Sequence, residues 1–216
     1  MLSPTSKFVG FLTIRVELQT GGATIFGGSE YFSRDLQNMG LGTNSDNLTA
    51  AYIDHIAVIR VEGRGSFKVS SPLKQFIHQV IEKKSANRIV IDMSDCTGMD
   101  STFMGVIAGL ACLIKSKQEF RFKLINLSEK NKKLLVTLGV DRVVDYALAS
   151  EKDSELNTCD LCGGEPLTAD FSNKLDAAKT TLEAHETLVD INPDNYSKFK
   201  SVLEFLENDV RSLSNE

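Results

Sequence analysis

The residues best suited to chemistry are an aspartate and two hydroxyl residues that follow one another, Asp100, Ser101 and Thr102. They separate a short β-branched segment from a long apolar one that is typical of a buried helix. Backbone N–H groups at the start of a helix lack partners within it, so such a junction can hold an anion or present a hydroxyl for phosphorylation. Asp, Ser and Thr are also the usual N-cap residues of helices. Residue types alone leave capping and phosphorylation open.

Two further aspartates, Asp92 and Asp95, flank the turn that precedes Asp100. Three acids around a metal would make a small metal-dependent enzyme, which is one alternative. We expect instead that Asp92 ends a strand and that Asp95 stabilises the turn through its own backbone. A serine hydrolase is poorly supported, because the GxSxG motif is absent and the histidines fall on three separate elements: His55, His78 and His185.

The four cysteines give no pattern of a disulfide framework. Cys159 and Cys162 form a single CxxC pair, and a structural zinc ion needs four ligands, so these two are only weak metal candidates. A complete site would have to recruit His185, a core cysteine or a second subunit. We expect free thiols and no cofactor, with Cys96 and Cys112 as small buried side chains.

Composition places the chain among ordinary globular proteins. It has 216 residues, of which 42% are hydrophobic and 25% charged, and a formal net charge of -5. The net negative charge argues against general nucleic-acid binding, which relies on clustered Lys and Arg. No apolar run reaches the roughly 18 residues that span a bilayer, and a signal-peptide pattern is missing. We therefore expect a cytoplasmic protein with no direct nucleic-acid or membrane partner.

Strands and helices alternate from about Tyr52 onward, which predicts an α/β domain with helices packed on a mixed or parallel sheet. One helix is expected to begin at Ser71-Pro72, with an N-cap followed by proline. Ser128 and Gly139 are expected to cap the two ends of another. The predicted strands lie at 56–61, 88–93, 120–127 and 143–146, and the central helix at 102–117.

The chain divides into four predicted segments. Residues 1–50 form a poorly patterned N-terminal extension and linker, 51–149 the α/β domain, 150–169 a polar linker, and 170–213 a C-terminal helical hairpin. The hairpin is predicted from two apolar stripes at helical spacing, the second opening at Asn192-Pro193. Because this tail is acidic, docking on the more basic domain and docking on another protein both stay open.

The succession of a buried strand at 89–94, the motif at 99–102, an apolar helix and the segments 122–126 and 134–140 resembles the STAS domain of anti-sigma-factor antagonists. The resemblance covers residues 52–149, in order and with similar spacing. It implies a STAS-type mixed sheet packed with α-helices. One departure is the bulky Phe103, which replaces a residue that usually lets the partner approach closely and predicts a different partner surface or helix angle.

The resemblance also implies a function. The serine after the aspartate would be phosphorylated by a serine kinase that is also the anti-sigma factor, and a phosphatase would reverse the mark. Here that serine is Ser101, with Thr102 as a second candidate. The protein would be a non-enzymatic regulator whose partner surface includes Ser66, Asp95, Met99, Asp100, Phe103 and Met104. The hairpin would tune or block that surface or form a homodimer contact. The main alternative is a STAS scaffold in another signalling complex with Ser101 unmodified.

Overall fold

The computed structural model describes residues 46–151, 164–167 and 174–215. All of them belong to one compact unit of the chain, Thr43–Glu216. Residues 1–45 of the N-terminal extension expected at 1–50 lie outside the described residues, as does the CxxC pair, Cys159 and Cys162. No helix in the described ranges is long and apolar enough to cross a membrane.

A mixed sheet of seven strands forms the centre of the unit, as expected. The main path runs β6-β5-β3-β2-β1-β7, and β4 pairs with β2. β1 is antiparallel to β2 and β7, whereas the other pairs are parallel. The strands span Asn47–Ile53 (β1), Ile56–Gly65 (β2), Arg88–Asp92 (β3), Cys96–Met99 (β4), Arg121–Leu127 (β5), Asp145–Leu148 (β6) and Glu165–Pro166 (β7).

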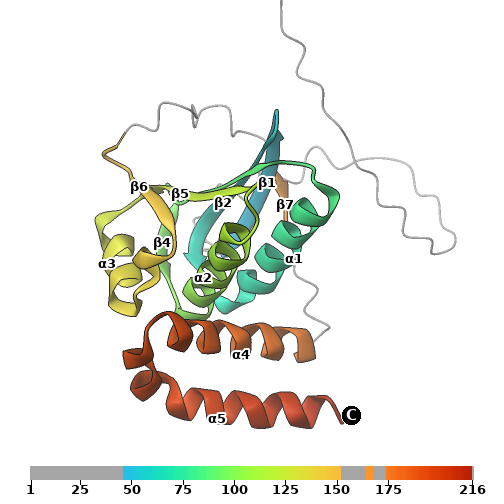
Figure 1. Cartoon of the computed structure of the whole chain (residues 1–216), viewed down its shortest axis with the longest axis vertical. Coiled ribbons are helices and arrows are strands. Elements are labelled where there is room, and N and C mark those ends of the chain that lie inside the picture. The colour runs from blue at the N-terminus through green and yellow to red at the C-terminus, as the bar shows by residue number, and fades with distance from the viewer. Residues whose placement is uncertain (1–45, 152–163, 168–173, 216) are drawn as a thin grey trace, which may run out of the picture. The chain divides into compact units, whose positions relative to one another are not determined.

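Helices α1, α2, α4 and α5 are stacked in successive layers on one side of the sheet (Figure 1). α1 and α2 lie between the sheet and α4, and α5 packs on α4 as the outermost element. The predicted C-terminal helical hairpin is therefore confirmed as α4 and α5. Their bounds are Phe67–Lys83 (α1), Ser101–Lys115 (α2), Glu129–Leu138 (α3), Lys174–Ile191 (α4) and Tyr196–Leu213 (α5), with short 3-10 turns at Val140–Arg142 and Pro193–Asn195.

The core lies between the sheet and the pair α1 and α2. Aliphatic runs in the parallel strands put side chains on this face, and the apolar stripes of the two helices cover them. Fully buried side chains come from both layers and include Ile59, Leu73, Ile77, Ile89, Ile91, Phe103, Ile107 and Leu124. The start of α2 is consequently packed on the core that the sheet and α1 form.

Several element ends differ from the predictions because tertiary pairing sets them. β1 begins at Asn47, inside the segment expected to be a loop, because Leu48 turns into the core while Asn47 pairs with Glu62 of β2. A short β7 occupies the expected linker and pairs with β1. The last strand starts two residues late, at Asp145, because a 3-10 turn takes up Val140–Arg142.

Helix α1 begins at Phe67, four residues before the predicted N-cap Ser71, and Pro72 lies inside it. Proline lacks the N–H that would bond the carbonyl four residues earlier, so the interior position weakens the ladder without ending the helix. The caps of α3 are as predicted: the Ser128 side chain accepts from Asn131 N, and Gly139 ends the helix with φ 77°.

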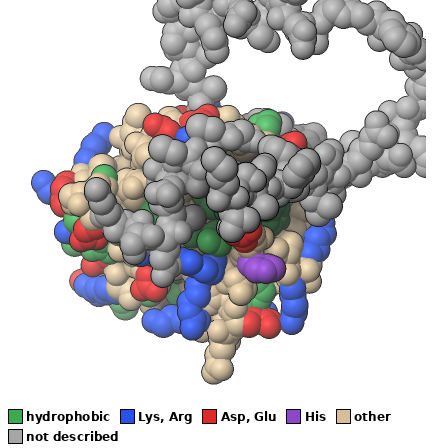
Figure 2. All heavy atoms as spheres, turned by 90° about the horizontal axis from the view of Figure 1, so that it is seen from above, with side chains coloured by type: hydrophobic (Ala, Val, Ile, Leu, Met, Phe, Trp, Pro, Cys, Tyr) green, Lys and Arg blue, Asp and Glu red, His purple; other side chains and the backbone are tan. Residues whose placement is uncertain are grey.

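Charged side chains are mixed over the face seen in Figure 2, which looks down on Figure 1 from above. On the part of this face formed by described residues, Lys and Arg side chains lie among Asp and Glu side chains. Nucleic-acid backbones are bound by clustered basic side chains, so this face differs from such a surface.

Candidate functional site

A single carboxylate, that of Asp100, caps two helices. As the N-cap of α2 it accepts from Phe103 N at 2.9 Å through Oδ1. Its Oδ2 accepts from Phe67 N, the first N–H of α1, at 2.8 Å. The Asp100 amide in turn donates to the Gly65 carbonyl at 2.9 Å. Capping by Asp100 is therefore confirmed, and it fixes the starts of α1 and α2 relative to each other.

Ser101 is the first residue of α2 and is half-buried. Its Oγ lies 3.0 Å from Nε2 of His185 on α4. The other ring nitrogen, Nδ1, lies 2.8 Å from the Thr181 carbonyl oxygen. Because a carbonyl can only accept, Nδ1 carries the hydrogen, and in the neutral ring Nε2 accepts from the Ser101 hydroxyl. The serine is thus a hydrogen-bond donor to a helix 84 positions further along the chain.

His185 is itself buried, with 4% of its surface exposed. Its ring meets Phe199 of α5 edge to face, with centroids 4.9 Å apart. The prediction that the histidines lie on separate elements holds, but it missed that α4 brings His185 to Ser101. A hydrolase triad still does not result, because the ring faces a backbone carbonyl on its far side and the Asp100 carboxylate is occupied by two N–H groups.

Most of the other predicted partner residues are buried. Ser66, Met99 and Met104 are each 5% exposed, and Phe103 is fully buried. A Cβ on Gly65 would lie 2.5 Å from the Phe103 ring, so this phenylalanine packs against the end of β2. Because its ring faces inward, Phe103 does not itself lie on the surface, and an altered partner surface or helix angle stays a prediction. Thr102, the second candidate acceptor, is 5% exposed and presents no open hydroxyl.

Two residues named around the site have exposed side chains, and one of them, Phe67, is bonded to Asp100. Asp95 exposes 58% of its side chain, and Phe67, whose amide Asp100 caps, is 57% exposed. Sequence reasoning missed Phe67 because it placed the residue before the start of α1. An exposed aromatic side chain next to a candidate site is a usual anchor for a protein partner.

The acidic residues of the preceding turn do not form a metal site. Asp92 ends β3, as predicted, and is fully buried, where it pairs with Arg60 at 3.2 Å and accepts from Asn126 Nδ2 at 2.8 Å. It also accepts from Ser94 N, so Asp92 rather than Asp95 stabilises this turn. Among the described residues, no three His, Cys, Asp or Glu side chains group as metal ligands would.

The two described cysteines have different surroundings. Cys96 is buried, and this burial raises the pKa of its thiol above the ordinary value. Cys112 is exposed on α2, so the prediction that it is buried is wrong. The apolar stripe of α2 turns other residues inward, and Cys112 falls on the opposite side of the helix.

A family model described as the STAS domain matches residues 47–154. The chain belongs to the STAS domain family. The resemblance noted from the motif and the order of elements is thereby confirmed.

Solved structures similar to this STAS protein are described as anti-sigma factor antagonists or related proteins. The unphosphorylated form of the anti-sigma factor antagonist SpoIIAA is 18% identical, with 48% of this chain and 90% of that chain covered and a TM-score of 0.42. TM1081 of Thermotoga maritima is 20% identical, with 63% and 97% covered and a TM-score of 0.43. The phosphorylated form of SpoIIAA from Bacillus is 18% identical, with 48% and 93% covered and a TM-score of 0.40.

Proposed function

We propose that this STAS protein is a phosphorylation-switched interaction regulator of the anti-sigma-factor-antagonist kind and that Ser101 is its acceptor. The observation that carries the proposal is the position of Ser101, directly behind the double cap of Asp100 at the first turn of α2. The backbone around the hydroxyl is held by bonds to both α1 and β2. A kinase would therefore meet a rigidly placed serine at a helix N-terminus.

Phosphorylation at this place changes the charge of the surface around Asp100. A phosphoserine adds about -1.5 to -2 charge at pH 7. Placed beside the Asp100 carboxylate, this charge repels any partner that docks there through acidic groups and raises the desolvation cost of binding. A coupling of about 1 to 3 kcal/mol changes affinity roughly 5- to 150-fold, which suffices for a switch.

The partner implied by this proposal is a serine kinase that also acts as an anti-sigma factor, with a serine phosphatase that resets the site. Exposed Phe67, whose amide Asp100 caps, would form the contact beside Ser101. Exposed Asp95 stays a predicted partner residue on the same chain. The protein itself would act without catalysis, in the cytoplasm.

A second candidate function is favoured by the bond between Ser101 and His185. A hydroxyl that donates to a buried histidine already has a structural role. In that case the chain is a STAS scaffold module of another signalling complex, and Ser101 stays unmodified.

Phosphopeptide mass spectrometry on the protein purified from its native cells separates the two functions. Phosphate on Ser101 supports the regulator, and an unmodified Ser101 across growth and stress conditions supports the scaffold. A pull-down then tests the switch with Ser101→Ala and Ser101→Asp. We expect Ala to retain the partner and Asp to weaken binding. Ser150→Asp, which adds the same charge at an exposed position away from the site, is the control; equal capture by all proteins would contradict the charge switch.

A further inference from the structure

Helix α4 approaches α2 most closely one turn after Ser101, at Gly105. A Cβ added to Gly105 would lie 2.2 Å from the Ala184 carbonyl oxygen and 2.8 Å from the Ala184 Cβ. Real Cβ atoms do not come this close to backbone, so only glycine admits α4 in this position. At Gly109, one turn further on, the nearest atom would be Thr187 Oγ1 at 3.6 Å, an ordinary contact. A methyl group at position 105 would therefore collide with α4, whereas one at position 109 would not.

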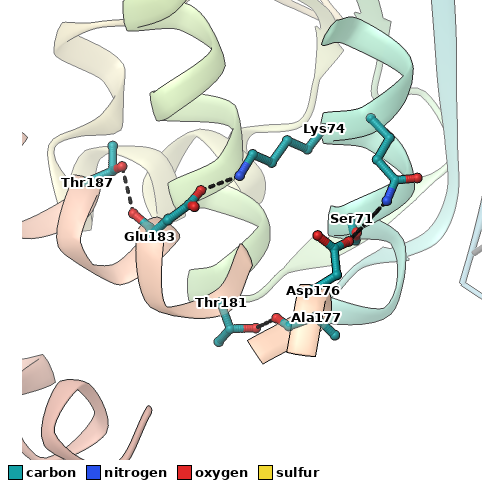
Figure 3. Close-up of polar contacts among 8 residues, drawn as sticks. Ser71, Lys74, Asp176, Ala177, Thr181, Glu183 and Thr187 are labelled. Carbon is teal, nitrogen blue, oxygen red and sulfur yellow. Dashed lines mark hydrogen bonds and ion pairs between the residues drawn. The ribbon is translucent and has the colours of Figure 1, made fainter. Parts of the chain in front are cut away.

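Polar side chains attach α4 to α1 as well (Figure 3). Asp176, at the start of α4, accepts from Ser71 Oγ at 2.7 Å and from Gln75 Nε2 at 3.0 Å. Two turns later Glu183 forms an ion pair with Lys74. Helix α4 thus lies across α1 and α2 together. Asp176 and Glu183 point to α1, and Ala184 lies against Gly105 of α2.

The seam between these three helices is incompletely filled. A hollow of about 280 Å³ lies between them, lined among others by Lys74, His78, Val106, Leu110 and Glu183. This hollow is partly open to solvent and reaches Gly105 and Gly109, so solvent lies next to the contact between α2 and α4.

The covered surface is the one that a kinase has to reach. Phosphoryl transfer needs the transferred phosphorus in line with the attacking oxygen, at close approach to Ser101 Oγ. That approach is obstructed by the His185 ring, which lies 3.0 Å from the oxygen. We propose that α4 and the kinase compete for the first turns of α2, so that the C-terminal hairpin is an intramolecular cover of the acceptor. This proposal rests on the proposed function of Ser101.

Phosphate on Ser101 would in turn prevent α4 from packing on α2 again. A phosphorylated Ser101 no longer has the hydroxyl proton that it donates to Nε2 of His185. The phosphate is also larger than the 3.0 Å gap between the two side chains. Once modified, the serine cannot take α4 back in the same position, so kinase action would leave the α2 surface open.

The test compares Gly105→Ala with Gly109→Ala. Both changes favour helix α2 by a similar intrinsic propensity, but only the first places a methyl group against the backbone of α4. Cover opening is read in a Ser101→Cys background from the rate of alkylation by N-ethylmaleimide, resolved by peptide mass. We expect Gly105→Ala to raise the rate at position 101 by about tenfold or more, the equivalent of 1.4 kcal/mol. Gly109→Ala should match the parent.

Exposed Cys112 serves as an internal standard for the reagent in every sample. If position 101 reacts as fast in the parent as in Gly105→Ala, the hairpin is no cover. A charge swap gives an independent route to the same state: Lys74→Glu should open the cover, and adding Glu183→Lys should close it again. Circular dichroism checks that each variant keeps its helices.

Phosphorylation is then measured on chains that retain Ser101, incubated with native-cell extract and ATP and read by phosphopeptide mass spectrometry. We expect more phosphate on Ser101 in Gly105→Ala than in Gly109→Ala or the parent. Equal phosphate in all three, with the cover opened in the first, overturns competition between α4 and the kinase. No phosphate on Ser101 in any chain sinks the proposed function and the kinase competition with it, while the alkylation rates still decide whether α4 covers the residue.

Discussion

Asp100 joins the first turns of two helices, and the first residue of α1, Phe67, precedes Asp100 by 33 positions in the chain. Asp100→Ala removes both caps, and a lost cap costs typically 1 kcal/mol. We expect the free energy of unfolding to fall by about 2 kcal/mol in urea titration. Asp95→Ala is the matched control, because Asp95 is exposed and its ion pair with Arg60 is long, at 3.9 Å. This change should alter the free energy of unfolding by less than about 0.5 kcal/mol. Equal losses in the two variants would refute the double cap.

The buried thiol of Cys96 should make the free energy of unfolding depend on pH in the alkaline range. Burial raises the pKa of this thiol, so the folded protein keeps the proton at a pH where the unfolded chain releases it. The stability that the protonated Cys96 thiol contributes to the folded protein is fully present below the ordinary thiol pKa. It is lost as the pH rises through the raised pKa of the folded protein. Urea titrations at increasing pH from about 8 upward should show a steeper decline for the wild type than for Cys96→Ala. Parallel curves would mean that the thiol has no linkage to folding.

At the scale of elements, the turn between α4 and α5 is anchored by Asn195, which is fully buried. Its amide nitrogen donates to the Leu138 carbonyl at the end of α3 and to the Leu188 carbonyl of α4. Asn195→Ala leaves two buried acceptors without this donor, at a cost of about 1 to 3 kcal/mol for each unsatisfied group. We expect faster hydrogen exchange throughout α4 and α5, measured by mass spectrometry.

The control for that measurement is Asn208→Ala on the same hairpin. Asn208 is exposed and donates only to the Glu204 carbonyl of its own helix. It should leave exchange in α4 unchanged. If both variants accelerate exchange alike, the anchor is not Asn195.

Elements whose ends are set locally could be predicted from the sequence, and the others could not. The apolar run of β3 and the Ser128 and Gly139 caps of α3 carry their own signals and were found. The start of α1 was missed because the carboxylate that caps Phe67 comes from the start of α2. β1 was not predicted, because pairing with β2 makes this segment a strand.

At the scale of the whole molecule, the pairing of Ser101 with His185 had no local signal. Apolar stripes predicted the hairpin but not the surface it would cover, since a stripe says only that some face must be buried. Gly105 and Gly109, four residues apart in an apolar helix, were the one available indication, because small residues let a second helix come close. The candidate acceptor was thus predictable from the motif, and its cover was not.

If the hairpin covers Ser101 as proposed, its short connection to the sheet affects the partner concentration that is needed to displace it. Leu167 is bonded to Leu48 at the β1 edge, and only residues 168–173 separate it from the start of α4. That connection spans at most roughly 25 Å, so an undocked hairpin stays near its seat at an effective concentration on the order of millimolar. A free partner would have to compete with the tethered hairpin for the surface of α2. The length of the connection would therefore set the partner concentration at which the regulator responds.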